Sequence, residues 1–464
     1  MPLAVAAYSI WVLVALFSNF SLYADGAHEF LRVLEAQNFV PFWWSRHFSF
    51  YIYQFPLVLA LKLGVTSLPA LRFALGLGCF LPWVLALLLC RWISRENFWL
   101  AVMGCAAGYL NGAYMPVGQH TIAHALFWPA LFVLLFARPL KTSAALVLLA
   151  TATGLQFSYE SQVFLCAPLL ALSVWRLFQK NGENANLTRL IFLTAAALFL
   201  LSILNGIYSL LMPEIPANLI GFKIGTLRMF QQPGWTLTWT VLFGGVAAAA
   251  CLSEKIWRFL SGKSGFYLGA TTVLIWGFWP LLAPDRLDTG IQYDNRSVNL
   301  FVPLALLPVG LILSFRPSWL ASRRERLTQF AAVLLLAQSF WHISCACLWY
   351  RDTVSMRQVL VTQHGLYPLH YTMLEKDGML GRLARKGAIG GRFDWSWPCL
   401  SIALSPSKQI GCLICSEIFL EPNLKRQCWQ PFDPMLPATL PNLARYGIDF
   451  TNYTTILQKQ LAPD

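Results

Sequence analysis

Charged residues are scarce in this chain of 464 residues. They make up 12% of the sequence, whereas hydrophobic residues make up 57% and the mean hydropathy is +0.55. Such a composition excludes a soluble globular protein, in which about a quarter of the residues are charged. The net charge of +13 comes from small basic groups between apolar runs. That distribution indicates membrane topology and not a nucleic-acid-binding surface, so nucleic acid is not expected as a partner.

Several sequence signatures are also missing. The chain has no internal repeat, no low-complexity tract, no nucleotide-binding glycine loop and no nucleophile elbow. What it does have is a series of apolar runs long enough to match the thickness of a bilayer. These runs predict a polytopic membrane protein.

The apolar runs predict eleven membrane spans. Their backbone polar groups can be satisfied in lipid only by helix, because the runs lack the alternating pattern of barrel strands. The expected fold class is therefore all-α, with spans near 3–22, 69–89, 97–117, 121–137, 142–158, 160–177, 190–212, 236–252, 266–283, 298–315 and 328–349. The first run has no basic segment before it, which favours a span over a cleaved signal peptide.

The segment from Phe50 to Leu63 is apolar but only fourteen residues long, and it contains Pro56 and Lys62. We expect it to lie in the membrane interface or to re-enter. If this segment is not counted as a span and the N-terminus is cytoplasmic, the basic residues are concentrated in the loops on the cytoplasmic side. A first outer loop at 23–68 and the tail then both face outward. Residues 1–349 form the transmembrane module and 350–464 a small extracytoplasmic domain.

The tail contains four cysteines: Cys399, Cys412, Cys415 and Cys428. An even number in an oxidising compartment predicts one or two disulfides. The spacing of Cys412 and Cys415 also suits half of a zinc site, although no second pair or histidine partner follows it.

The first outer loop contains the densest group of ionisable residues. Asp25 lies just beyond the first span, where partial desolvation raises the pKa of a carboxylate and suits it to accept a proton. If a helix begins near Gly26, then Asp25, His28, Glu29 and Arg32 share one face. The alternative is a solvated surface on which Asp25 caps the helix and Glu29 pairs with Arg32.

An acidic residue just after the first span, inside a long first outer loop and followed by many spans and an outward tail, resembles the GT-C superfamily of membrane glycosyltransferases. The resemblance covers the architecture of about the first 350 residues. It implies transfer of a sugar from a polyprenyl phosphate, at the outer face of a bacterial inner membrane or the lumenal face of the endoplasmic reticulum. Asp25 would be the base or would position the acceptor. The family commonly has two acidic residues that are adjacent or one residue apart, whereas in this chain Gly26 follows Asp25 and the next acidic residue is Glu29. This difference leaves open the role of Glu29 and the need for a divalent cation.

Transfer from a lipid phosphate needs cations where negative charge develops on the departing oxygens. The expected catalytic residues are Asp25, Glu29 and His28. The expected substrate-binding residues are ten further ionisable residues on the outer side: Arg32, Arg46, His47, His120, His124, Glu160, Lys223, Arg228, Arg286 and Arg296. For each arginine or lysine the alternative is an ordinary loop charge or a contact with a lipid headgroup.

His120 and His124 stand four residues apart and share a helix face. Two ligands make an incomplete metal site, so they are interpreted as the polar lining of a cavity. Glu160 is costly at the end of a span unless it faces a cavity or a partner.

The sequence thus predicts an inverting membrane glycosyltransferase that binds a polyprenyl-phosphate sugar, membrane lipids, and a glycan, lipid or protein acceptor. The expected location is a bacterial inner membrane, with the site facing the periplasm. A polysaccharide polymerase or ligase would share the substrate class and the outer arginines. A transporter or flippase would need paired ionisable residues at the midplane. A non-enzymatic scaffold would tolerate replacement of the first-loop cluster.

Overall fold

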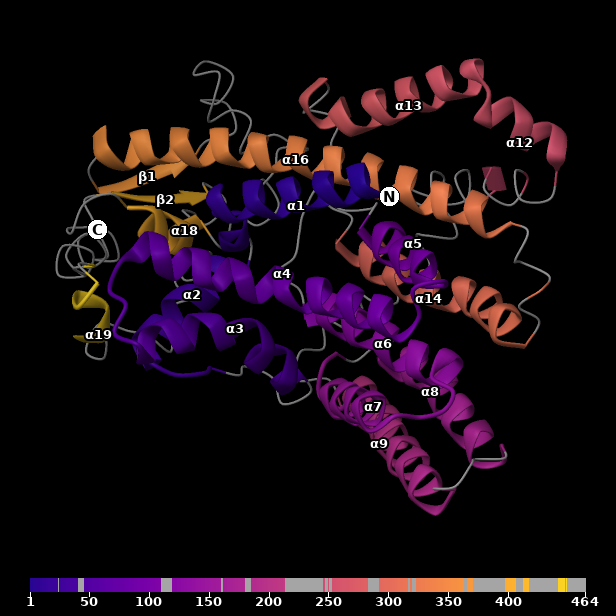
Figure 1. Ribbon diagram of the computed structural model, residues 1–464. Coiled ribbons are helices and arrows are strands. Elements are labelled where there is room, and N and C mark those ends of the chain that lie inside the picture. The colour runs from indigo at the N-terminus through magenta and orange to yellow at the C-terminus, as the bar shows by residue number, and fades with distance from the viewer. Residues whose placement is uncertain are drawn as a thin grey trace.

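A computed structural model describes most of the chain (Figure 1). The described residues are 1–23, 25–40, 46–109, 119–159, 162–179, 185–212, 245–246, 249, 253–282, 292–315, 318, 323–362, 365–369, 397–405, 412–416, 441–446 and 448. Only the backbone is described for both strands and for residues 25, 107–109, 119, 292–301, 397–398, 441 and 444.

The described chain is helical, as the apolar runs predict. Its first part contains α1 (Pro2–Phe17), the 3-10 turn η1 (Phe20–Leu22), α2 (Asp25–Ala36), α3 (His47–Lys62), α4 (Leu68–Ile93), α5 (Phe98–Tyr109), α6 (Gln119–Phe136), α7 (Thr142–Leu155), α8 (Gln162–Leu177) and α9 (Ala185–Leu211).

The second part adds a two-stranded parallel sheet to further helices. Its elements are α12 (Glu254–Ser261), α13 (Lys263–Leu282), α14 (Gln292–Phe315), α16 (Arg324–Thr362), β1 (Gly365–Leu369), α18 (Trp397–Leu404), β2 (Cys412–Ser416) and α19 (Pro441–Ala444). The strands pair with Gly365 opposite Cys412.

Four of these helices, α4, α9, α13 and α16, are long and apolar enough to cross a membrane. The helices α1, α6, α7 and α8 and the second half of α14 are apolar but shorter. The first expected span differs from the structure, because α1 ends at Phe17 and not near residue 22. The span expected at 236–252 lies almost entirely outside the described residues. The described residues thus contain four helices of spanning length, and the total of eleven stays a prediction.

The longest helix, α16, continues past Tyr350, where the last span was expected to end. Its 39 residues correspond to about 58 Å at about 1.5 Å per residue. A hydrocarbon core is about 30 Å thick, so the helix extends well beyond one face of a bilayer. The segment expected to open a separate tail domain is therefore a continuation of the last span.

The interior is filled by large aromatic side chains and by close helix contacts. Trp11, Trp83, Trp99, Trp128 and Trp349 are each no more than 2% exposed. The helix α1 packs along α16, which also contacts α13 and α5, while α4 packs against α3 and α6.

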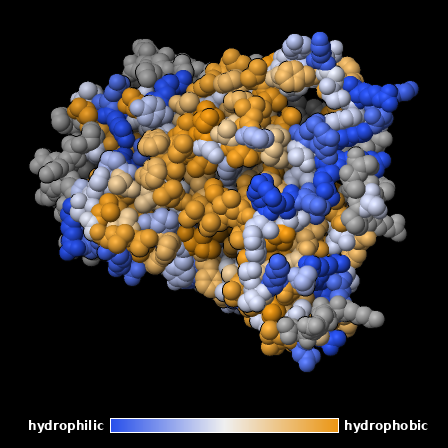
Figure 2. Space-filling view, in the orientation of Figure 1, coloured by the Kyte–Doolittle hydropathy of each residue, from blue (hydrophilic) through white to orange (hydrophobic). Residues whose placement is uncertain are grey.

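The elements of the tail gather at the end of α16 that carries the first-loop helix α2 (Figure 1). Both α18 and α19 pack against α2, and β2 packs against α18 and α16. On the face in Figure 2, apolar residues form a broad band across the middle, and hydrophilic residues gather toward the two ends. A band of this kind between polar ends fits a bilayer.

The contact between α3 and α4 gives a test of the packing. A Cβ built on Gly78 would lie 1.7 Å from the backbone oxygen of Tyr53, whereas one on Gly269 in α13 would meet no atom within 4 Å. We expect Gly78→Ala to destabilise the protein by about 1–3 kcal/mol or more, because a backbone atom cannot rotate away. Gly269→Ala is the control and should be neutral or slightly stabilising. Thermal unfolding of the purified proteins measures both, and an unchanged midpoint for Gly78→Ala would contradict this packing.

Candidate functional site

The turn between α1 and α2 positions the first residue of α2. Asn19 adopts a left-handed backbone conformation with φ of 57°, which asparagine tolerates better than most residues. Its carbonyl accepts a hydrogen bond of 3.2 Å from the indole of Trp349 in α16. The Trp349 ring also meets Tyr23 edge to face at 5.4 Å. This anchored turn starts α2 at Asp25, one residue before the start considered from the sequence. The Asp25 side chain lies outside the described part, and its role stays a prediction.

Glu29, one turn into α2, is buried with 4% exposure. Gln54 in α3 donates a hydrogen bond from Nε2 to Glu29 Oε2 at 3.0 Å. Arg32 lies close enough for its positive charge to attract Glu29. The Tyr53 hydroxyl lies beside the same carboxylate but makes no hydrogen bond of ordinary geometry to a described residue. The solvated-surface interpretation therefore does not hold for Glu29, and His28 beside it is half-buried.

Burial lowers the pKa of Arg32, while Glu29 and Tyr53 act in the opposite direction. A guanidinium titrates so far above neutral pH that Arg32 stays charged, and it supplies a cation next to a buried carboxylate. Glu29 and Arg32 thus combine a proton acceptor with a positive charge. The low dielectric constant of the buried surroundings strengthens the attraction between them and the hydrogen bond from Gln54.

A second group forms where the start of α3 meets the connection between α7 and α8. The Ser49 hydroxyl donates to the Ser158 carbonyl at 2.8 Å, which holds the two segments together. The guanidinium of Arg46, 6% exposed, stacks over the Tyr159 ring at 4.7 Å. The His120 ring lies 5.7 Å from the same tyrosine ring. The structure thus brings together Arg46 and His120, two expected binding residues, around an aromatic ring that sequence reasoning did not select.

Gln162 fixes the loop that carries Tyr159. Its Oε1 accepts the backbone N–H groups of Ser158 at 3.1 Å and Tyr159 at 3.2 Å. Its Nε2 donates to the carbonyls of Gln156 at 2.7 Å and Ser202 at 3.2 Å. A buried side chain with all of these bonds holds the loop in one conformation.

The two remaining candidate histidines, His124 and His47, do not join these groups. His124 is buried between Trp83, at 5.2 Å, and Trp128, at 6.2 Å. It packs in the core one helical turn after His120 and does not belong to the group formed by Arg46, His120 and Tyr159. His47 is half-buried, with its ring 6.0 Å from Tyr51. Within the described residues, no three histidine, cysteine or acidic side chains lie close enough to hold a metal ion.

Five expected residues cannot be placed against these groups. Glu160, Lys223, Arg228 and Arg286 lie outside the described residues. Arg296 belongs to α14, but its side chain is not described. Their binding roles stay predictions.

The tail covers the other end of α2. The Asn442 amide donates to the Glu35 carbonyl at 2.8 Å, and the Leu443 N–H donates to the Glu35 carboxylate at 3.2 Å. Burial raises the pKa of Glu35, and the backbone donors of Leu443 and Asn442 oppose that shift. The Tyr446 hydroxyl donates to Gln37 Oε1 at 2.9 Å. The tail and the first loop therefore form one packed unit.

The expected disulfides are corrected in one respect. Cys399 in α18 is a buried free thiol, because α18 packs into the core against α2 and β2. Among the described residues it therefore has no disulfide partner. Cys412 and Cys415 lie on β2 with side chains that are not described, and Cys428 lies outside the described residues.

No known protein family, curated protein or solved structure matches this chain. The resemblance to the GT-C superfamily therefore stands on the residues quoted for it.

The hydrogen bonds of Gln54 give a test of how the buried Glu29 carboxylate is held. Gln54 also accepts the Val40 N–H at 2.9 Å and donates to the Val40 carbonyl at 3.2 Å. We expect Gln54→Leu to lower stability by about 1–3 kcal/mol for each buried group left without a partner. The exposed Gln358→Leu is the control.

Replacing both partners sharpens this test. Because removing both members of a buried pair can be nearly neutral, the double variant Glu29→Leu/Gln54→Leu should recover part of the loss. Thermal unfolding of the four proteins gives the coupling energy between the two side chains. If the changes in stability of the two single variants simply add up in the double variant, Glu29 and Gln54 do not stabilise each other.

Proposed function

We propose that this protein is a membrane glycosyltransferase that moves a sugar from a polyprenyl phosphate to a glycan, lipid or protein acceptor. The observation that supports it most is the buried carboxylate of Glu29, held by Gln54 beside Arg32 at one end of an apolar helical bundle. Burying a charged pair in a protein with so little charge costs free energy, which favours a chemical role over a purely structural one. Asp25 begins the same helix one turn earlier.

The proposed reaction is a direct displacement with inversion. Asp25 accepts the proton of the acceptor hydroxyl, whose oxygen forms the new bond to the anomeric carbon of the sugar. The bond between that carbon and the phosphate oxygen breaks, and the phosphate leaves with the electron pair. Glu29 and His28 support the base. Cations near the phosphate stabilise the charge that develops on it.

The group around Tyr159 suits the sugar or the phosphate. Arg46 is held over the ring face at 4.7 Å, and His120 lies at 5.7 Å from the same ring. A buried guanidinium beside an aromatic ring offers both donors and an apolar surface. The proposed phosphate ligands also include Lys223, Arg228, Arg286 and Arg296. Glu160 and His47 remain proposed substrate-binding residues.

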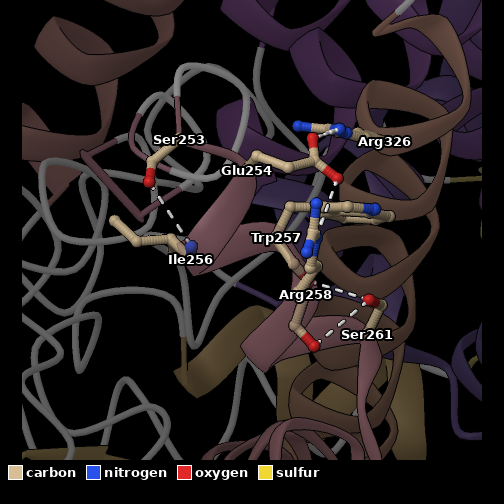
Figure 3. A network of polar contacts seen from close by, with 7 residues as sticks. All are labelled: Ser253, Glu254, Ile256, Trp257, Arg258, Ser261 and Arg326. Atoms are coloured by element: carbon tan, nitrogen blue, oxygen red, sulfur yellow. Dashed lines mark hydrogen bonds and ion pairs between the residues drawn. The ribbon is translucent and has the colours of Figure 1, made fainter.

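The proposed topology has eleven spans, a cytoplasmic N-terminus and the site on the outer face of a bacterial inner membrane. The opposite end of the molecule is rich in arginine, in keeping with the positive-inside rule. There Arg326 of α16 contacts Glu254 and lies 5.2 Å from the Trp257 ring of α12 (Figure 3). Arg324 pairs with Glu96 at 2.8 Å. The exposed residues of α12 include Ile256 and Phe259, which suits a helix lying in the membrane interface.

Asp25→Asn tests the catalytic proposal. The amide cannot accept the acceptor proton at neutral pH, so we expect transfer from a polyprenyl-phosphate sugar to fall by about a hundredfold or more, with unchanged thermal stability. The control is Glu325→Gln at the arginine-rich end, where the side chain is exposed. A polymerase or ligase that depends on arginines of later loops would tolerate Asp25→Asn. Full transfer by the stable variant would therefore rule out this mechanism.

Cysteine labelling tests the topology separately. Gln358 is exposed on the extension of α16, and Lys255 is exposed on α12 at the other end. A membrane-impermeant maleimide added to intact cells should label Gln358→Cys above the level of the parent protein. Lys255→Cys should react only after the membrane is permeabilised. The reverse pattern would place the candidate site in the cytoplasm.

A further inference from the structure

Arg72 lies near the beginning of α4 and is buried, with 7% exposure. Its Nε donates to the Leu68 carbonyl of its own helix at 3.3 Å. Its Nη1 is buried and has no hydrogen-bond partner in the described part of the chain. A guanidinium has five N–H donors and cannot lose its charge, so a buried and incompletely bonded arginine is costly. Such a group needs an explanation.

Arg357 makes the electrostatic cost larger. It lies on the extension of α16, close enough to Arg72 for the two positive charges to repel each other. Its Nε is also buried without a hydrogen-bond partner among the described residues. The acid nearby on the same helix, Asp352, bonds to Arg351 at 3.4 Å. Two neighbouring cations thus retain unused donors.

The pair lies at the end of the bundle that carries α2. Arg72 is one turn before Gly76 on the same face of α4. A Cβ on Gly76 would lie 2.6 Å from Leu16 and 3.5 Å from the Ser21 hydroxyl, so this face meets the junction of α1 and η1. In Figure 1 the beginning of α4 and the end of α16 lie at the same end of the molecule, beside the tail. In the proposed topology this is the outer membrane surface.

We infer that Arg72 and Arg357 bind a phosphate group at the membrane surface. A phosphate oxygen accepts bonds from the planar fork of arginine, and its negative charge offsets the repulsion between the two cations. Lipid headgroups place phosphates at this depth, and a free phosphate offers the same chemistry. The inference does not rest on the proposed transfer reaction, because it concerns binding alone.

Thermal stability of the full-length protein in an uncharged detergent provides the test. Dodecyl phosphate and inorganic phosphate are titrated separately, because a ligand that binds the folded state raises the unfolding temperature. Arg72→Gln and Arg357→Gln should each raise the half-saturating concentration about tenfold or more, the loss expected for a charged hydrogen bond. Arg91→Gln is the control, since Arg91 is exposed at the other end of the same helix.

A second readout separates binding from a structural role. Without ligand, Arg357→Gln should unfold at the same or a higher temperature than the parent, because one of two like charges is removed. If Arg72→Gln does not fold, Arg357→Gln alone decides the question. Stabilisation by both compounds identifies a general phosphate site, and stabilisation by dodecyl phosphate alone identifies a lipid phosphate. The inference fails if neither compound stabilises the parent, or if both stabilise the variants equally.

Discussion

A carboxylate buried at the end of an apolar bundle must receive hydrogen bonds and a nearby positive charge, because water cannot supply them. Glu29 receives a bond from Gln54 of α3 and the charge of Arg32 on its own helix. This requirement fixes how α2 and α3 pack against each other, and the close approach of Gly78 to Tyr53 fixes α3 against α4. The candidate site is therefore positioned by the same contacts that stabilise this end of the bundle.

Much of the fold could be predicted because apolar length is a strong signal for a membrane helix. A helix beginning near Gly26 was also considered, since the ionisable residues there recur at helical spacing, and α2 begins one residue earlier, at Asp25. The end of α16 was not predicted. Its last turns contain Arg351, Asp352 and Arg357, which end the apolar signal but not the helix. Hydropathy reports where a chain leaves the bilayer, and a helix need not stop at that point.

The site was less predictable, because it depends on contacts between distant segments. His120 and His124 share a helix face, yet one meets Tyr159 and the other packs between tryptophans. Gln54 is a single amide in an apolar stretch, and Tyr159 stands in a short polar segment beside Glu160. In neither case does the neighbouring sequence indicate which distant residue the side chain contacts. Arg72 carried a usable signal, since a charge inside a predicted span is costly and marks a site.

The contact between the tail and α2 has a consequence for how the molecule matures. Asn442 bonds to Glu35 across a separation of 407 residues. Translation proceeds from the N-terminus, so α2 is made long before the segment that covers it. The first-loop helix gains these bonds only after almost the whole polypeptide has been synthesised and the tail has reached the same side of the membrane. Completion of the last segment is thus the step that sets the first loop in its final place.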